Sequence, residues 1–502
     1  METRRADETS RPSGPRSGLD TQVVVIGAGC AGIAAARVFH EHGVHAILIE
    51  AKSCIGGRVC AGRPFTPNLT AAPDERRVVV YPGANWIHDL DETTNPLYRA
   101  ALRMRVTLHA TSPDHDPGVD VCMFDGGRVV PPELYARARE RYRWIRTHWN
   151  VSGDDASYEG MVRQTIADSN AVYGECGDVE LRVLRWMTDL VANTLASPLG
   201  RVLKTPYAHA GTDSGDALVE GGYFQILRHL ADEYPLDVRL GHRVTRVVDE
   251  LTCVRVACRT AGGDETTLSA RACLVTLPVG VLHSNAVAFV PRVPAHLQRV
   301  AASVSSGTMN LVWIWYPTAF WPEGYNYLGA TRDATRDGPS STFSTFLVPT
   351  VYDDTGARQP ILMGQVVGEY AISIETQTPM QIALEATRVL RGMFGAEAVP
   401  DAIGCDRSAW SSDPLARGSW SYVDVSACTQ CTSSAEGADT EADKADEADE
   451  ADEQRSAVYY AGEARSQDNT AHGAYLSGER EARRMIERLF QQNPNPRSAL
   501  WH

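Results

Sequence analysis

The apolar positions closest to the amino terminus predict a strand, a helix and a second strand. The β-branched run from Val23 to Ile26 ends in glycine, and apolar residues then recur at helical spacing from Ala31 to His42. A second apolar run, from His45 to Ile49, ends at Glu50. Such elements within about thirty residues match the size of one βαβ unit, in which a helix joins two parallel strands.

Further along the chain, helix-rich stretches alternate with strand-rich ones. Apolar residues have mainly helical spacing in residues 130–195 and 377–395, and a last helix is predicted from about Gly473 to Phe490. Strands are predicted at Val78–Tyr81, Asp237–Leu240, Val244–Val248, Cys253–Cys258 and Ala272–Leu277, and as a pair at Leu311–Trp315 and Ile361–Val367. This mixture predicts an α/β fold with an α+β part outside the first βαβ unit.

Composition and charge are typical of a soluble enzyme and argue against a nucleic-acid-binding protein. Hydrophobic residues make up 43% of the 502-residue chain and charged residues 22%, which is typical of a soluble globular enzyme. Residues 436–453 hold ten acidic residues and one lysine, a net −9, which leaves only −6 of the formal −15 for the rest of the chain. A net charge of −6 produces only a weak negative field around the protein. This field either favours cationic substrates or only keeps the protein soluble. Since no basic footprint is present, we expect no nucleic-acid partner.

Several segments contain too few apolar residues to pack into a core. We expect residues 1–20 to form a disordered arm, without the apolar stretch of a secretory signal, and residues 491–502 to form a tail. No run is long enough to span a bilayer, so the sequence predicts a cytoplasmic protein without a membrane partner. Residues 427–455 form an acidic, low-complexity insertion that we expect to be solvated, with a short helix as the alternative.

The cysteines do not suggest a disulfide framework or a metal site. There are eleven, an odd number, scattered along the chain, which suits a reducing compartment better than secretion. Cys428 and Cys431 form a single C-x-x-C motif without a second ligand pair nearby, so redox or metal use is the minor interpretation. We therefore predict no metal ion in the functional site.

The first strand leads directly into the glycine motif G-x-G-x-x-G. Gly27 permits a tight turn, Gly29 lets the backbone approach a pyrophosphate, and Gly32 allows close packing of helix on strand. The helix amino terminus offers unpaired N–H groups to phosphates. Glu50, at the end of the second strand, is placed to accept hydrogen bonds from ribose hydroxyls. These features predict a dinucleotide site, while the choice between NAD and FAD stays open.

The motif Gly56-Gly57-Arg58 favours FAD. Gly57 and Arg58 would bring a guanidinium to the pyrophosphate, although an ordinary turn is the alternative. At this point the chain resembles the flavin-containing amine oxidases, in which such a motif follows the first βαβ unit of an FAD site, and residues 460–478 match the closing signature of that family. The resemblance implies that Glu463 binds the ribityl or phosphate region and that an N–H near Ala471 faces the flavin pyrimidine edge.

A further motif narrows the resemblance to the polyamine oxidase branch, which includes spermine and acetylpolyamine oxidases. It runs from Gly83 to His88 and is followed by Asn95-Pro96-Leu97. The resemblance places Gly83 and Ala84 at the cofactor. It places His88 near the mouth of the substrate channel, where it could bind a substrate amine; a structural histidine is the alternative. Asp89 stands where the family usually has glycine, so the conformation of this turn can differ from that in the family.

The same resemblance assigns three more residues. Val244 would contact the adenine edge through its backbone. Trp420 stands where the family commonly has Tyr or Phe beside the flavin, with Thr470 on the other side, and a role in the core alone is the alternative for Trp420. An aromatic wall suits a substrate amine, which is attracted as a cation and oxidised as a neutral group.

Leu311 is the departure from the family with the largest chemical consequence. It occupies the position of a lysine that, in the family, holds a water at flavin N5 and assists reoxidation by oxygen. Leucine cannot donate a hydrogen bond, so we expect that water to be lost or to be held by another group. Neither flavin binding nor amine oxidation requires the lysine, whereas reactivity with O2 is put in question.

The resemblance therefore implies an FAD-dependent amine oxidoreductase that converts a C–N bond of a polyamine to an imine, with O2 as the electron acceptor and hydrogen peroxide as the product. A flavin-binding protein with little turnover is the alternative that Leu311 and the acidic insertion motivate. A histone demethylase is disfavoured, because the chain has no long heptad-rich insertion.

The resemblance also implies the domain organisation. A Rossmann-like FAD-binding domain would be assembled from residues 21–95, 205–290 and 456–490. It would be interleaved with a substrate-binding domain of mixed sheet and helices, built from residues 96–204 and 291–426. The active site is expected in the crevice between them.

Overall fold

The strand–helix–strand pattern at the amino terminus forms the centre of a large sheet. In the computed structural model, β1 (Thr21–Ile26) pairs in parallel with β2 (Ala46–Ile49), and α1 (Cys30–Glu41) connects them. On its other side β1 pairs in parallel with β13 (Glu265–Val275), which in turn pairs in parallel with β22 (Val458–Tyr460). The predicted βαβ unit is confirmed, and strands from three distant parts of the chain lie side by side.

The rest of this sheet contains both parallel and antiparallel pairs of strands. The strand order is β10-β2-β1-β13-β12-β11-β14, with β22 beside β13. The additional strands are β10 (Asp237–Arg239), β11 (His242–Asp249), β12 (Val254–Thr260) and β14 (Ala288–Val290).

The structure describes residues 19–70, 75–111, 120–149, 155–204, 215–250, 252–291, 304–332, 343–426, 456–466 and 469–491. Most of the predicted amino-terminal arm, the acidic insertion with its C-x-x-C motif, and the tail after residue 491 lie outside these residues.

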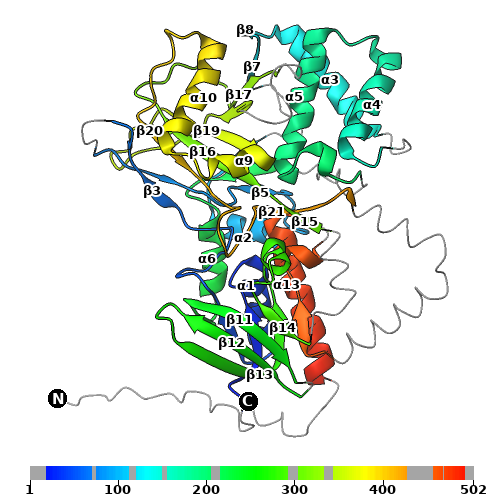
Figure 1. The fold of residues 1–502 in the computed structure, drawn as a ribbon, viewed down its shortest axis with the longest axis vertical. Coiled ribbons are helices and arrows are strands. Elements are labelled where there is room, and N and C mark those ends of the chain that lie inside the picture. The colour runs from blue at the N-terminus through cyan, green and yellow to red at the C-terminus, as the bar shows by residue number, and fades with distance from the viewer. Residues whose placement is uncertain are drawn as a thin grey trace.

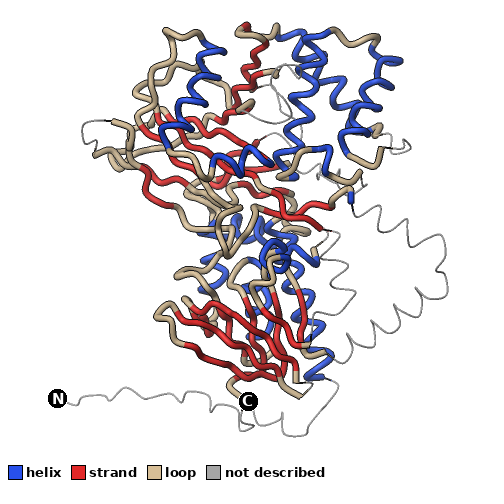
Figure 2. Tube along the Cα trace, in the orientation of Figure 1, coloured by secondary structure: helices blue, strands red, loops and turns tan. Residues whose placement is uncertain are grey.

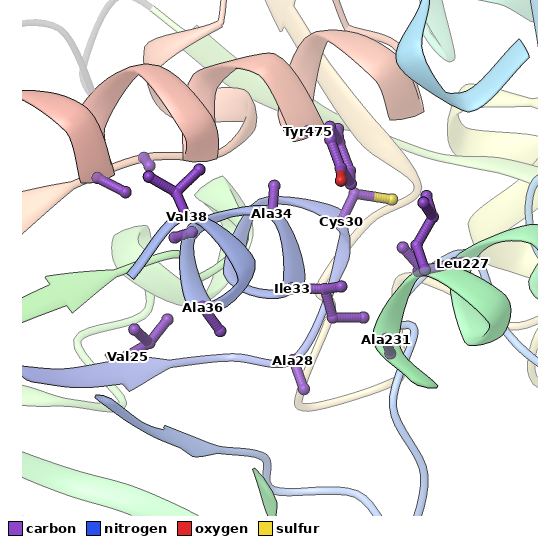
Figure 3. Close-up of a cluster of buried hydrophobic side chains, with 14 of the residues drawn as sticks. Val25, Ala28, Cys30, Ile33, Ala34, Ala36, Val38, Leu227, Ala231 and Tyr475 are labelled. Carbon is purple, nitrogen blue, oxygen red and sulfur yellow. The ribbon is translucent and has the colours of Figure 1, made fainter. Parts of the chain in front are cut away.

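Helices α1, α6 (Phe224–Asp232) and α13 (Ala471–Ile486) pack together beside this sheet (Figure 3). Ile33 and Leu227 belong to their shared core and are fully or almost fully buried, which stabilises the fold by about 1.5–3 kcal/mol for each such side chain. α1 and α13 approach closely, because a Cβ on Gly478 would lie only 2.1 Å from the carbonyl oxygen of Ala31. α2 (Pro96–Met104) contributes Leu97 to the same core.

A second sheet forms the other lobe of the molecule (Figure 1). Its strand order is β20-β16-β19-β18-β17-β7-β8. These strands are β7 (Val121–Asp125), β8 (Arg128–Val129), β16 (Met309–Trp315), β17 (Tyr327–Ala330), β18 (Thr345–Leu347), β19 (Ile361–Val367) and β20 (Gly404–Arg407). The predicted strand pair is confirmed, since β16 and β19 are antiparallel neighbours.

Both faces of this sheet are covered, which explains why every residue of β16 is buried and residues 311–315 are all apolar. Val312 and its neighbours on one face pack with α10 (Pro379–Phe394), and Leu311 and its neighbours on the other pack with α4 (Tyr158–Tyr173) and α5 (Asp178–Leu195). The remaining helices are α3 (Pro132–Thr147), α7 (Val279–His283), α9 (Gly368–Ile374), the 3-10 turns Leu199–Arg201 and Glu463–Arg465, and a π-helical turn, Glu487–Gln491.

Short sheets occupy the region where the two lobes meet (Figure 2). One has the order β5-β9-β6, from β5 (Trp86–His88), β9 (Asp216–Val219) and β6 (Leu108–Thr111). Another pairs β15 (Val304–Gly307) with β21 (Trp420–Val423), and β3 (Arg63–Phe65) pairs with β4 (Val78–Val80). The α/β fold class predicted from the sequence is confirmed, with a mixed sheet and helices in the second lobe.

Within the described residues, no helix combines the length and apolar character that crossing a membrane requires.

Candidate functional site

A cavity of about 380 Å³ opens where the parallel strands of the first sheet end. Residues just beyond the ends of these strands line it: Gly27 after β1, Glu50 after β2, Thr276 after β13 and Gly462, two residues beyond β22. The carboxyl edge of a parallel sheet is the usual place for a nucleotide, because loops and helix amino termini converge there. The cavity continues into the second lobe, where Leu311 and Trp420 line it.

The three motif glycines have distinct steric roles. Gly27 adopts φ = +103°, in the left-handed region that favours glycine. Gly29 caps α1 and lines the cavity, and a Cβ placed on it would meet no protein atom within 4 Å. A Cβ on Gly32 would lie 1.8 Å from the carbonyl oxygen of Gly27. Gly29 therefore keeps space for a ligand, whereas Gly32, which does not line the cavity, permits the packing of helix on strand.

The carboxylate of Glu50 is fixed at the end of β2. Its Oε2 accepts from the backbone N–H of Ala28 and its Oε1 from that of Lys52, each over 2.8 Å. The Nζ of Lys52 bonds in turn to Oδ2 of Asp413 at 2.8 Å. Glu50 lines the cavity, and each of its carboxylate oxygens has a lone pair left to accept another hydrogen bond. This carboxylate is therefore available at the ribose position that the sequence predicts.

Arg58 and Glu463 form an ion pair on the cavity wall. Nη1 of Arg58 donates to Oε2 of Glu463 over 2.8 Å and to the carbonyl oxygen of Ser419 over 2.9 Å. The other oxygen of Glu463 accepts from the backbone N–H of Val279 at 2.9 Å. Both oxygens of Glu463 thus bind protein donors and orient Arg58, and a direct bond from Glu463 to a cofactor stays a prediction.

The amino terminus of α13 also faces the cavity. Thr470 caps the helix by accepting from the N–H of Gly473 over 3.0 Å, and Ala471 is the first helical residue. Thr470 and Ala471 both line the cavity, where the positive end of the helix dipole favours negative charge. Burial raises the pKa of the nearby Cys30 thiol to about 12, so that group stays uncharged at neutral pH.

One wall of the second part of the cavity is built by the β5-β9-β6 sheet. Asp216 lies opposite His88 on one side and opposite Thr111 on the other, and all three line the cavity. Nδ1 of His88 lies 2.9 Å from Oδ1 of Asp216, whose side chain is only 8% exposed. Asp89 adopts φ = +64°, so this turn keeps the left-handed backbone that a glycine favours.

Another part of the cavity wall comes from α5, β16, β19 and β21. Leu311 is buried on β16, directly opposite Gln365 of β19. Nδ2 of Asn193 donates to Oε1 of Gln365 over 3.1 Å. The indole Nε1 of Trp420 donates to the carbonyl oxygen of Thr194 over 2.7 Å, which fixes the ring that lines the cavity.

The structure brings nearly all of the predicted site residues together. Fourteen of the fifteen line this one cavity: Gly27, Gly29, Glu50, Gly57, Arg58, Gly83, Ala84, His88, Val244, Leu311, Trp420, Glu463, Thr470 and Ala471. Their individual roles stay predictions. Sequence reasoning missed Asp216, Asn193 and Gln365, which lie on the same cavity but carry no motif of their own.

No group of three or more His, Cys, Asp or Glu side chains in the described part of the chain could hold a metal ion.

The sequence of the chain matches the model of one protein family and the sequences of several known proteins. The model of the family described as flavin containing amine oxidoreductase matches residues 30–486. Polyamine oxidase 4 of Oryza sativa subsp. japonica is 26% identical over 494 residues, which cover 94% of this chain and 90% of that protein. Lysine-specific histone demethylase 2 of Homo sapiens is also 26% identical, and the match covers 93% of this chain but 54% of that protein. For Lysine-specific histone demethylase 1 homolog 3 of Arabidopsis thaliana, the chain spans only 30% of its length.

The fold is shared with solved structures as well. A redesigned putrescine oxidase superimposes with a TM-score of 0.63 at 16% identity, covering 93% of this chain and 99% of that one.

Proposed function

Because the chain belongs to the family of flavin-containing amine oxidoreductases, we propose that it oxidises a C–N bond of a polyamine to an imine. FAD is the cofactor of this family. The site fits it: Gly29 leaves space at the helix amino terminus, Glu50 is held at the ribose position, and Arg58 is oriented on the cavity wall. When bound, FAD supplies the two-electron acceptor, which takes a hydride equivalent from the carbon next to the amine.

The buried carboxylate of Asp216 carries the polyamine part of the proposal. A polyamine keeps at least one ammonium group while another of its nitrogens is oxidised, and that charge needs a partner inside the cavity. Asp216 supplies a carboxylate, and Nδ1 of the His88 imidazole lies 2.9 Å from it. The carboxylate can therefore bind an ammonium group of the substrate, with His88 beside it.

In this proposal the reacting amine lies beside the part of the wall that α5, β16 and β19 form. It must be neutral to be oxidised, and the lining residues that α5, β16 and β19 contribute carry no charge. Leu311 and the fixed ring of Trp420 exclude water there and orient the carbon chain, which lowers the entropic cost of reaching the reactive geometry.

Molecular oxygen is the electron acceptor in this proposal, with hydrogen peroxide as product. The side chain of Leu311 offers no N–H group to a water or to oxygen, so reoxidation is expected to be slower than with a lysine at this position. The same observation supports a second candidate, a flavoprotein dehydrogenase that passes electrons to another acceptor, or a flavin-binding protein with little turnover.

An anaerobic titration of the purified holoenzyme tests the proposal. Spermine, a monoamine and an amino acid are added in turn while the absorbance of the oxidised flavin is recorded. Bleaching by spermine at the lowest concentration supports polyamine oxidation, and no bleaching by any of the three would remove it. Admitting oxygen afterwards separates the candidates, because rapid recovery of absorbance with peroxide release favours the oxidase and slow recovery favours the dehydrogenase.

A further inference from the structure

A closed loop between β20 and β21 lies against the cofactor end of the cavity. We call this loop, residues 410–418, the strap. Its base is closed because the carbonyl oxygen of Trp410 accepts from the backbone N–H of Gly418 over 2.8 Å. A loop whose two ends are bonded to each other is a compact unit. Four of its residues line the cavity: Trp410, Pro414, Leu415 and Ala416.

The tip of the strap is bound to the first lobe by an ion pair. Oδ2 of Asp413 lies 2.8 Å from Nζ of Lys52, which follows shortly after β2. The carboxylate is also held from within the strap, because its Oδ1 accepts from the backbone N–H of Leu415 over 2.8 Å. Nζ of Lys52 lies 5.8 Å from the ring centroid of Trp410, within the range of a cation–π interaction. Two side chains of the strap therefore attract the same ammonium group.

Lys52 belongs to the part of the first lobe that forms the predicted ribose position. Its backbone N–H donates to Oε1 of Glu50 over 2.8 Å, and its carbonyl oxygen accepts from the N–H of Gly241 over 2.9 Å. Glu50 and Lys52 both line the cavity, whereas Asp413 does not. Asp413 can therefore act on a bound cofactor only through Lys52 and the strap, which makes it a positioning residue.

One arm of the strap is anchored in the second lobe. The carboxylate of Glu375 accepts from the backbone N–H groups of Ser411 and Ser412, over 2.9 and 2.7 Å. Nδ2 of Asn310 on β16 donates to the same carboxylate over 2.8 Å. The strap is thus held by the second lobe, and the ion pair between Lys52 and Asp413 joins the two lobes across the cofactor end of the cavity.

This ion pair is weak enough to open. The Lys52 and Asp413 side chains are 27% and 22% exposed, so water and dissolved ions reach the pair and reduce its attraction. A ligand enclosed between two lobes can leave only when part of the wall moves. We propose that this ion pair is a latch that keeps the strap closed over the adenosine end of the FAD site, and that its opening sets the rate at which FAD enters and leaves. The inference goes beyond the proposed function, since it concerns the cofactor and not the amine.

Exchange of bound FAD for isotopically labelled FAD tests this role in the holoenzyme. The protein is kept in excess labelled FAD, and the label retained after gel filtration gives the rate of exchange. We expect Asp413→Asn to speed exchange by about threefold to tenfold, as for the loss of one part-exposed ion pair. The dissociation constant of FAD should change by less than about twofold, because an open strap speeds entry as well as exit.

Salt provides a test without any substitution. Raising the ionic strength from about 0.05 to about 0.5 M screens the ion pair, so exchange should become faster in the unaltered holoenzyme but not in Asp413→Asn. This comparison decides the matter even if another variant does not fold.

Two further variants assign the effect to the pair. If both residues act through one interaction, Asp413→Asn should have no additional effect on exchange in a protein that already carries Lys52→Gln. The matched control is Asp401→Asn, which breaks an ion pair with Arg391 (2.9 Å) away from the cavity lining and should leave exchange unchanged. Thermal unfolding of each holoenzyme checks that the variant is folded.

Three results would overturn the inference. The first is an exchange rate that neither salt nor Asp413→Asn alters. The second is faster exchange with an equal rise in the dissociation constant, because the pair would then hold the bound cofactor and not control opening. The third is a full effect of Asp413→Asn in the presence of Lys52→Gln. Failure of every amine to bleach the flavin would instead contradict the proposed function and would leave these exchange rates unchanged.

Discussion

Arg58 donates to Glu463 over 2.8 Å, although the two residues stand 405 positions apart in the chain. The carboxylate of Glu463 is 6% exposed and also accepts from the backbone of Val279, so it ties the first βαβ unit to the last strand–helix junction. Arg58 is held at the predicted pyrophosphate position by a residue from the opposite end of the sequence.

Replacing this carboxylate by an amide is expected to weaken both the fold and cofactor retention. Glu463→Gln leaves the guanidinium of Arg58 without its charge partner, which should lower the free energy of unfolding by about 2 kcal/mol. FAD content after gel filtration should fall as well. Urea denaturation measures the first effect and flavin absorbance the second.

A matched control is Arg228→Gln, which breaks an ion pair whose two side chains are both 59% exposed. We expect that change to alter the unfolding free energy by less than about 0.5 kcal/mol. Equal effects of the two substitutions would contradict a special role for the Arg58–Glu463 pair.

Gly29 and Gly32 should respond differently to the same methyl group. Gly29→Ala directs its Cβ into open cavity, so the protein should fold normally but lose at least about tenfold in FAD affinity, because the methyl occupies the space in front of the helix amino terminus. Gly32→Ala places its Cβ 1.8 Å from a carbonyl oxygen and should destabilise the fold by about 3 kcal/mol. Thermal unfolding of the apoproteins and FAD titration distinguish the two effects, and unchanged FAD affinity in Gly29→Ala would contradict this assignment.

The local positions of these residues could be predicted for a physical reason. Gly27, Gly29 and Gly32 lie within one turn, and Glu50 follows the next strand of the same βαβ unit, so short-range sequence signals are enough to place them. The strand pair of β16 and β19 was predictable because residues 311–315 are all apolar and residues 361–367 are mostly apolar, as is usual for strands covered on both faces.

Asp216, Asn193 and Gln365 could not be found in the same way. Asp216 and His88 are 128 positions apart in the sequence, and Asn193 and Gln365 are 172 apart. Each contact depends on how strands and helices from different segments are aligned. A single aspartate on a four-residue strand has no local pattern that distinguishes it from a surface residue. The register of β5 with β9 decides its place, and that register is a property of the assembled fold.

Introducing a lysine at Leu311 is expected to speed reoxidation of the reduced flavin. Leu311 lines the cavity on β16, where the resemblance implies a lysine that assists oxygen, and an ammonium group there can donate to a water or stabilise developing negative charge. We expect Leu311→Lys to raise the rate with O2 by about tenfold or more, an effect of about 1.4 kcal/mol on the barrier. Stopped-flow mixing of reduced enzyme with oxygen measures it. Leu311→Met is the uncharged control, and a similar gain with Met would contradict the role of the charge.

Buried thiols predict a loss of stability in alkaline solution. Burial raises the pKa of Cys405 from an ordinary value of 9.0 to about 12. Between these values the folded protein keeps the proton while the unfolded chain loses it, so stability is complete below about pH 9 and falls as the pH rises. Between pH 7 and pH 10 the unaltered protein should lose on the order of 1 kcal/mol more than Cys405→Ala. Urea denaturation at both pH values measures this difference, and identical losses would contradict it.

Asp216→Asn should separate charge recognition from the chemical step. The substitution keeps the shape of the side chain but removes the charge that, by our proposal, binds an ammonium group of the substrate. Since hydrogen bonds to charged groups contribute about 1.5–3 kcal/mol, the apparent dissociation constant for a polyamine should rise by about 10- to 100-fold. The limiting rate of anaerobic flavin reduction should change much less, because our proposal places the reacting amine beside Leu311 and Trp420 and not at Asp216.

Two comparisons make this prediction specific. Glu220→Gln is the same chemical change at an exposed carboxylate that pairs with His109, and it should leave polyamine binding unaltered. A monoamine has no second ammonium group, so Asp216→Asn should weaken its binding far less than that of a polyamine. If both substrates lost affinity equally, Asp216 would act by positioning His88 rather than by binding a substrate cation, and the charge would have to be assigned elsewhere in the cavity.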